Sequence, residues 1–290
     1  MLFSPLVAIG AIEAVIAMLQ RANQDFDELS TGTFASHASL SCFLCAVLPL
    51  SAFVGSQLFA IGNRKLASIF AIESVLVAGG VLASFSRVGW LFLGFFAVAT
   101  AVRHAKTHRL TAVVATAIFA GVVFFSMSPQ YLESRLGRLN SWSGLRHDLN
   151  VNRWGSALQL FAKAPTFGHG AGAFPVAYSV YIGRKKGDEV PEVPSAENDY
   201  LQMLAELGLT GSVLLCGLAI SFLRQVRLDV RASDAVTREF LWAAAASLGA
   251  VGLHCLLDRQ ITRPAIAFEV AWICGLIVAC GGGSLRKYPT

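Results

Sequence analysis

Polar residues in this chain are concentrated between Ser128 and about Asn198, the only stretch where a sizeable aqueous site could form. His169, within the run Gly168–Gly172, could act as a base, because histidine is the residue type suited to proton transfer near neutral pH, and the glycines could present backbone N–H groups to phosphate. Glu197 is expected in the first turn of a helix, whose dipole favours the ionised carboxylate that a base requires. The alternatives are a structural turn at the glycines and simple charge complementarity at Glu197.

Other ionisable residues fall within apolar stretches of the sequence. Glu13, Glu73 and Glu269 would be costly in hydrocarbon and should face the interior of a helical bundle. At about 1.5 Å per residue, Glu269 is expected roughly 8 Å below the outer surface, where it could line the bottom of an outward cavity. Glu73 is expected to pair with a hydroxyl or a backbone carbonyl. His254 and Asp258, one helical turn apart, form either a capped pair or part of an acceptor site.

The composition indicates that these residues are positioned by a membrane protein. The 290 residues are 55% hydrophobic and 14% charged, with a mean hydropathy of +0.59, whereas soluble domains carry about 25% charged residues. The net charge of +5 is clustered between apolar runs, which indicates membrane topology and not a nucleic-acid partner. All six cysteines lie in apolar runs, where free thiols pack as small hydrophobic groups, and no metal site is expected.

The apolar runs predict an all-α fold, a polytopic transmembrane helical bundle, because only helices or closed barrels satisfy the backbone in lipid. The expected domains are residues 1–127 with five spans, a large loop at 128–199, and residues 200–290 with three spans. The eight expected spans are Leu2–Leu19, Ala38–Ile61, Leu66–Phe85, Val88–Val102, Leu110–Met127, Tyr200–Leu223, Phe240–Leu257 and Pro264–Gly281.

The loop charges predict the orientation. The basic clusters all fall on one side of an eight-span plan, and that side should be cytoplasmic. Both termini are therefore expected in the cytoplasm, and the 128–199 loop on the outer, periplasmic face. The basic clusters are Asn63–Lys65, Arg103–Arg109, Arg224–Arg238 and Leu285–Lys287.

The outer loop should carry structure of its own. Residues 152–163 place Trp154, Leu158 and Phe161 on one stripe, which predicts a helix lying on the membrane surface. Pro165 should end that helix, and residues 183–194 resemble a mobile lid. Ser195 is expected to be the N-cap of the next helix, which should enter the membrane near Tyr200.

Several motifs, in one order along essentially the whole chain, resemble the O-antigen ligase family. They are Thr31–Phe34, Ser86–Trp90, the Arg-Trp-x-x-Ala-Leu of residues 153–158, Pro165–Phe174, Glu197–Gly211 and the stretch from His254 to Pro264. Members of that family usually have about a dozen spans, so the first spans are expected to be missing from this chain. The family also commonly carries His, its proposed catalytic base, where this chain has Glu197.

The resemblance implies a membrane glycosyltransferase, either a ligase or a polymerase. It would move an undecaprenyl-diphosphate-linked glycan to a glycan or lipid A-core acceptor at the outer face of the bacterial inner membrane, with inversion and without a cofactor or metal. Arginine binds phosphate oxygens bidentately and stays charged, so Arg87 and a loop arginine, Arg153 or Arg146, would hold the diphosphate. Glu197 would be the base. A snorkelling anchor at Arg87 and lipid-headgroup contact at the loop arginine are the alternatives.

Further polar residues would contact the substrates, and the partners would be the donor, the acceptor, membrane lipid and other polysaccharide-assembly proteins. The substrate-binding candidates are Arg146, His169, Asn198, Asp199, Tyr200 and Asp258. Two functions of other classes compete with transfer. A transporter of lipid-linked sugar would show inverted repeats or broken helices at mid-membrane, neither of which is apparent in the sequence, and a non-catalytic assembly subunit would tolerate changes at Arg87 and Glu197.

Overall fold

The structure is a computed structural model that describes residues 4–23, 29–100, 151–181 and 195–281. Within these ranges the chain is helical and has no strand, which confirms the predicted all-α class. It divides into two compact units. The first contains α1, α2, α3, the helix Arg87–Thr100, α10 and α11. The second contains α7, α8, most of α9 and the loop Cys255–Ile261.

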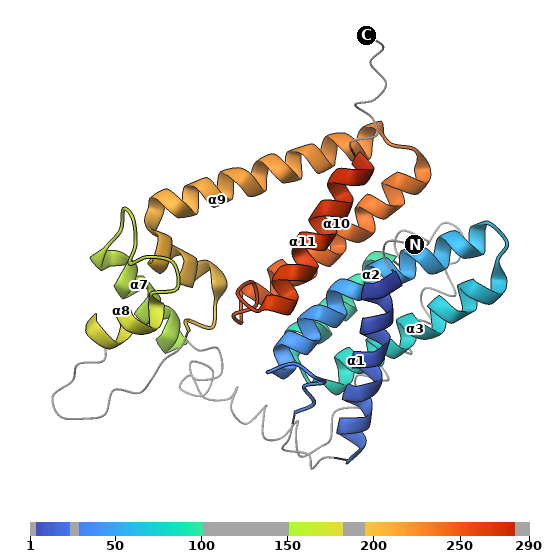
Figure 1. Cartoon of the computed structure of the whole chain (residues 1–290), viewed down its shortest axis with the longest axis horizontal. Helices are drawn as coiled ribbons and strands as arrows, with labels where there is room; N and C mark the ends of the chain where they lie inside the picture. Colours follow the sequence, from blue (N-terminus) through green and yellow to red (C-terminus); the bar gives the residue numbers. More distant parts are fainter. Residues whose placement is uncertain (1–3, 24–28, 101–150, 182–194, 282–290) are drawn as a thin grey trace, which may run out of the picture. The chain divides into compact units, whose positions relative to one another are not determined.

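In the first unit, α1 (Ser4–Asn23), α2 (His37–Ala60) and α3 (Arg64–Ala83) lie side by side (Figure 1). Helix α2 is the central element, because every residue from Ala38 to Ser51 is buried. Close packing of α1 on α3 depends on Gly80, since a Cβ there would lie 2.7 Å from the Cα of Ala14. Small residues that let helix backbones approach are typical of helix pairs in lipid.

The Thr31–Phe34 motif is fixed by polar residues of α1. The Glu13 carboxylate accepts hydrogen bonds from the Thr33 backbone N–H (3.0 Å) and hydroxyl (2.5 Å). Two turns further along α1, the Gln20 amide oxygen accepts from the N–H groups of Thr31 and Gly32 (3.1 and 2.8 Å), and its amide nitrogen donates to the Gly32 carbonyl. Glu13 therefore faces the bundle interior as predicted, and it holds the connection to α2.

Helix α10 (Ala235–Cys255) contacts α2 at two points. The rings of Phe53 and Phe240 lie 5.8 Å apart, and His254 Nε2 is 3.3 Å from the Ser41 hydroxyl. The helix begins after Asp234, whose carboxylate accepts the Thr237 backbone N–H at 2.8 Å, and this hydrogen bond lowers the pKa of Asp234. Because α10 ends at Cys255, Asp258 lies beyond it, so the prediction that His254 and Asp258 are one turn apart on the same helix is wrong.

Two of the predictions about carboxylates within the spans were wrong. Glu269, on α11 (Pro264–Gly281), has no exposed surface and so lines no open cavity. Glu73 is also buried, and among the residues that the structure describes neither it nor Glu269 has a hydrogen-bond partner on its carboxyl oxygens. Helix packing closes the space around both side chains, which sequence spacing does not reveal.

Most of the expected spans are present as long apolar helices. Among the described residues, α1, α2, α3, α9 and α11 are long and apolar enough to cross a membrane, and Arg87–Thr100 is a shorter apolar helix. Helix α10 forms but does not belong to that set, since it carries Arg238 and Glu239 in its first turns. The expected span 110–127 lies outside the described residues. The length and apolar composition of these helices therefore indicate a multi-pass membrane protein.

The second unit is built around α7 (Val151–Lys163), α8 (Phe174–Tyr181) and the first turns of α9 (Asp199–Ala232), which gather at one place in Figure 1. The predicted loop helix is confirmed within one residue. However, its buried face is formed by Ala157 and Leu160, while Leu158 of the predicted stripe is exposed. The core of this unit consists of Ala157, Leu160, Phe174, Ala177, Ala196 and Ala205.

Candidate active site at the start of helix α9

An ion pair between Arg153 and Glu197 joins α7 to the residues just before α9. The Arg153 guanidinium lies 2.8 Å from Glu197 Oε1, and their side chains are 39% and 21% exposed. The Ser195 hydroxyl donates to the same oxygen at 2.6 Å. The structure thus brings together two residues that the sequence predicted to be catalytic, although they are 44 positions apart.

The sequence predicted Glu197 in the first turn of α9, but it lies just before that helix. It precedes the helix with a φ of 51°, in the left-handed region that non-glycine residues seldom adopt. The Trp154 indole N–H donates to its backbone carbonyl at 3.4 Å, so α7 contacts both the backbone and the side chain of Glu197. Backbone conformations of this kind cost about 1–3 kcal/mol and are held by their surroundings, often at functional sites.

The N-cap of α9 is Asn198, which corrects the prediction of Ser195. The Asn198 side-chain oxygen accepts the Leu201 backbone N–H at 2.9 Å, and its carbonyl accepts the Gln202 N–H at 3.0 Å. Ser195 lies too early in the chain to cap the helix, because the left-handed residue Glu197 turns the backbone before the first helical position. The hydroxyl of Ser195 binds Glu197 instead.

Asn198 and Asp199 hold a second segment against the helix start. The Asn198 amide donates to the Leu256 carbonyl at 2.7 Å, and Asp199 Oδ2 accepts the backbone N–H groups of Gln260 and Ile261 at 2.6 and 2.9 Å. Both side chains are buried. Both side chains therefore hold the segment 256–261 against the start of α9, and their predicted contact with a substrate stays a prediction.

The segment 165–170, which includes part of the glycine-rich run, packs across α9 through backbone hydrogen bonds. We call this contact between residues 165–170 and 205–210 the glycine crossing. The helix is interrupted at Gly208 (φ 65°, ψ −169°), and the neighbouring backbone groups bind the segment 165–170. Four hydrogen bonds join the two: His169 N–H to Ala205 O (3.1 Å), Gly170 N–H to Glu206 O (2.8 Å), Leu209 N–H to Pro165 O (2.8 Å) and Thr210 N–H to Thr166 O (3.0 Å).

The break at Gly208 also separates a packed part of α9 from an exposed apolar part. Residues before it pack into the core of the second unit, as Leu201 and Ala205 do, whereas Leu209, Val213 and Leu214 after it are exposed apolar residues. An exposed apolar face is what lipid covers. The exposed apolar surface of α9 is therefore found after Gly208, within a helix that is long and apolar enough to span a membrane from Asp199 to Ala232.

Two polar residues that the sequence did not single out complete the crossing. The buried Glu206 carboxylate accepts the backbone N–H groups of Gly172 (2.8 Å) and Phe174 (3.2 Å), at the start of α8, and the Gln202 amide (3.0 Å). Gln202 in turn accepts the Ala196 N–H at 3.1 Å. Their spacing of four residues, just before a glycine, was the only sequence signal for this role.

His169, Tyr200 and Asp258, the other described residues predicted to bind substrate, lie on three different segments of the chain. His169 Nε2 lies 2.9 Å from the Leu160 carbonyl and its ring is 5.1 Å from that of Tyr181, which favours the structural alternative for this histidine. Tyr200, in the first turn of α9, is half exposed. The Asp258 carboxylate accepts the N–H of its neighbour Arg259 at 2.7 Å. Arg146 and the predicted lid, residues 183–194, lie outside the described residues.

Arg87 belongs to the first unit, where it begins the helix Arg87–Thr100. Ser86 is the N-cap of the helix Arg87–Thr100, since its hydroxyl accepts the Gly89 N–H at 3.3 Å and its carbonyl accepts the Trp90 N–H at 3.0 Å. Arg87 is thus the first helical residue, and it is exposed. Phe85 before it has a φ of 53°, and its ring packs against that of Trp90 in a tilted arrangement, with the centroids 5.6 Å apart.

The arrangement around Glu197 can support proton transfer. Both donors to its carboxylate, from Arg153 and Ser195, bind Oε1, and no described residue forms a hydrogen bond to Oε2. A carboxylate fixed through one oxygen can accept a proton on the other. An adjacent guanidinium can bind an oxyanion, since arginine has several N–H donors in a planar fork.

Comparison with known proteins identifies the family. A family model described as O-antigen ligase matches residues 72–216, which is half of the 290-residue chain. No curated protein sequence matches the chain. The matched range contains the helix that starts at Arg87, the Arg153–Glu197 pair and the glycine crossing at Gly208. The chain is therefore a multi-pass membrane protein that belongs to the O-antigen ligase family.

Proposed function

We propose that this protein is a glycosyltransferase of the bacterial inner membrane. It transfers a glycan from undecaprenyl diphosphate to a sugar hydroxyl, on a glycan or on lipid A-core, at the outer face of the membrane. The observation that carries the proposal is the Arg153–Glu197 pair, in which Oε1 has two donors and Oε2 has none among the described residues. Its position within the matched family range supports it further.

In the proposed reaction, Glu197 Oε2 accepts the proton of the acceptor hydroxyl. The hydroxyl oxygen forms a bond to the anomeric carbon, the bond from that carbon to the diphosphate oxygen breaks, and its electron pair leaves with the diphosphate. Attack from the face opposite the leaving group inverts the anomeric centre. Arg87 and a loop arginine are each candidates for binding the diphosphate oxygens, because guanidinium groups stabilise the charge that develops there. Arg153 also orients Glu197 by the ion pair.

A transporter function is less well supported, although α9 is broken at Gly208. In transporters, a broken helix leaves backbone groups that bind the substrate or ion. Here the N–H groups of Leu209 and Thr210 and the carbonyls of Ala205 and Glu206 all bind the segment 165–170. The break is used to build the second unit, so its backbone groups are not available to a ligand.

The test is deletion of the gene, followed by complementation with variants at Glu197 and Arg153. Glu197→Gln keeps the size and the hydrogen-bonding oxygen but cannot take a proton, so transfer should fall at least about 100-fold. Glu197→His, which restores the residue common in the family, should retain more activity than Gln. Arg153→Gln should also lose transfer. Lys163→Gln is the control, since it removes a charge from the same helix outside the ion pair.

The readouts are electrophoresis of the surface glycan and analysis of the undecaprenyl-linked pool. Long polymer on undecaprenyl diphosphate with a bare acceptor identifies a ligase, and accumulation of single repeat units identifies a polymerase. Full transfer by Glu197→Gln, with normal protein in the membrane, would contradict the role of Glu197 as base. Unchanged pools after deletion would contradict the enzymatic function and favour an assembly subunit.

A further inference from the structure

A groove outside the proposed active site lies between α2 and α3, where the two helices meet at a short turn. The groove is open on one side and has a volume of about 610 Å³, within the range of about 300–1,000 Å³ that is usual for ligand sites. Small residues from both helices make room for it, among them Ala52 and Gly55 on α2 and Ala67 and Ala71 on α3. A Cβ at Gly55 would lie 3.3 Å from Phe70 Cβ, so the helices are already close there.

The walls of the groove are mainly apolar, and they open onto an apolar surface. Phe59 and Phe70 contribute rings to the lining. Outside it, Ile69 and Ile72 of α3 are 58% and 62% exposed, and α3 is long and apolar enough to span a membrane. A surface of this kind faces lipid in a membrane protein, so acyl chains have direct access to the groove.

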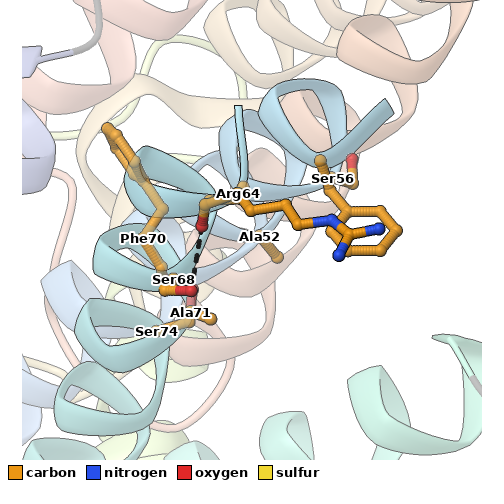
Figure 2. A pocket seen from close by; sticks show the side chains of 10 residues that line it. Ala52, Ser56, Arg64, Ser68, Phe70, Ala71 and Ser74 are labelled. Carbon is orange, nitrogen blue, oxygen red and sulfur yellow. Dashed lines mark hydrogen bonds between the residues drawn. The ribbon is translucent and has the colours of Figure 1, made fainter. Parts of the chain in front are cut away.

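One end of the groove is positively charged. Figure 2 shows the Arg64 side chain extending across this end toward Ser56, while the Arg64 carbonyl accepts the Ser68 hydroxyl at 2.9 Å. Among the described residues, none forms an ion pair with the Arg64 guanidinium. Lys65 follows directly, and the first turn of α3 contains no acidic residue.

This charge arrangement favours the binding of an anion at the start of α3. Cations at a helix N-terminus are unfavourable, because the dipole already places positive charge there. A phosphate at this end would be stabilised by the Arg64 guanidinium, which lines the groove, and by the helix dipole together. The basic cluster Asn63–Lys65, at the turn between α2 and α3, is also one of those predicted to face the cytoplasm, where anionic headgroups attract juxtamembrane basic residues.

We propose that the groove between α2 and α3 binds an anionic phospholipid. The phosphate of the headgroup lies on the Arg64 guanidinium, and an acyl chain occupies the apolar groove beside Ala71 and Phe70. The bound lipid bridges α2 and α3 at the end where their charges are otherwise unbalanced. This site is independent of the proposed transfer chemistry at Glu197.

The test uses the full-length protein in detergent, depleted of lipid, and titrated with phosphatidylglycerol or phosphatidylcholine. Thermal unfolding and native mass spectrometry report binding. Phosphatidylglycerol should raise the melting temperature, and phosphatidylcholine and inorganic phosphate should not. Arg64→Gln should weaken the apparent affinity about tenfold or more, the usual effect of losing a charged hydrogen bond. Lys65→Gln is the matched control, because Lys65 does not line the groove, and it should stay within about twofold of the wild type.

A second variant tests the apolar part without changing any charge. Ala71 is exposed within the groove, so Ala71→Leu should fill it and weaken phosphatidylglycerol binding. Val75→Leu, an exposed position of α3 outside the groove, is its control. Equal stabilisation by phosphatidylcholine, stabilisation by inorganic phosphate alone, or wild-type binding by Ala71→Leu would each overturn the proposal. A change of oligomeric state in Ala71→Leu would overturn it too, since a second copy of the chain would then cover the groove.

Discussion

The glycine crossing of α9 leads to a specific prediction about stability. Gly208 has a backbone conformation, φ 65° and ψ −169°, that is essentially restricted to glycine. A Cβ at this position would collide with the Gly168 backbone nitrogen and lie 2.5 Å from the Thr166 carbonyl oxygen. Because the obstacles are backbone atoms, no side-chain rotation can relieve the contact. Gly208→Ala must therefore separate the loop 165–170 from the helix.

The size of the effect follows from what the separation breaks. The backbone conformation alone costs a residue with a Cβ about 1–3 kcal/mol. Four backbone hydrogen bonds cross the contact, and each contributes about 0.5–1.5 kcal/mol net. Losing half of them adds about 1–3 kcal/mol, so the expected destabilisation is about 2–6 kcal/mol. At about 2–4 °C per kcal/mol, the value for domains of 150–250 residues, the melting temperature should fall by at least roughly 4 °C.

The assay is thermal unfolding of the purified protein in detergent, followed by tryptophan fluorescence. Trp154 reports on this unit, because its indole N–H binds the Glu197 carbonyl. Gly217→Ala is the matched control on the same helix, since a Cβ at Gly217 meets no atom within 4 Å, and it should leave the melting temperature unchanged or slightly higher. If Gly208→Ala melts within about 2 °C of Gly217→Ala, the crossing does not hold the unit together and the reasoning fails.

Two further carboxylates should act through stability. Asp199→Ala should destabilise the protein by about 2–4 kcal/mol, because it leaves the N–H groups of Gln260 and Ile261 without their acceptor. Asp199→Asn keeps one acceptor oxygen and should lose clearly less stability in the same unfolding assay. Equal losses of stability for the two variants would contradict the hydrogen-bond argument. Glu13→Ala should lower the free energy of unfolding by about 1–3 kcal/mol, since the backbone N–H and hydroxyl of Thr33 lose their acceptor. Glu13→Gln should retain part of this stability. A wild-type melting temperature for Glu13→Ala would show that the Thr31–Phe34 segment is held by other contacts.

The sequence alone determined the class of the protein and the position of its helices. Apolar runs of about 20 residues have one stable solution in lipid, so the span predicted at Ala38–Ile61 is the observed α2, His37–Ala60. The loop helix was also predicted closely, because residues 152–163 have a helical spacing of apolar side chains and Pro165 cannot continue a helix. Motif order placed the chain in its family, which the match to residues 72–216 confirms.

Only the tertiary structure decided what the polar residues do. Sequence spacing cannot show that Arg153 meets Glu197, since residues 44 positions apart are joined by packing and not by helix periodicity. It also suggested Ser195 as the cap and a continuous helix from Tyr200, whereas the left-handed Glu197 moves the cap to Asn198 and the loop 165–170 interrupts α9 at Gly208. Local sequence fixes helices by hydrophobic burial and backbone hydrogen bonding, but side-chain partners are selected by long-range contacts that form only in the folded chain.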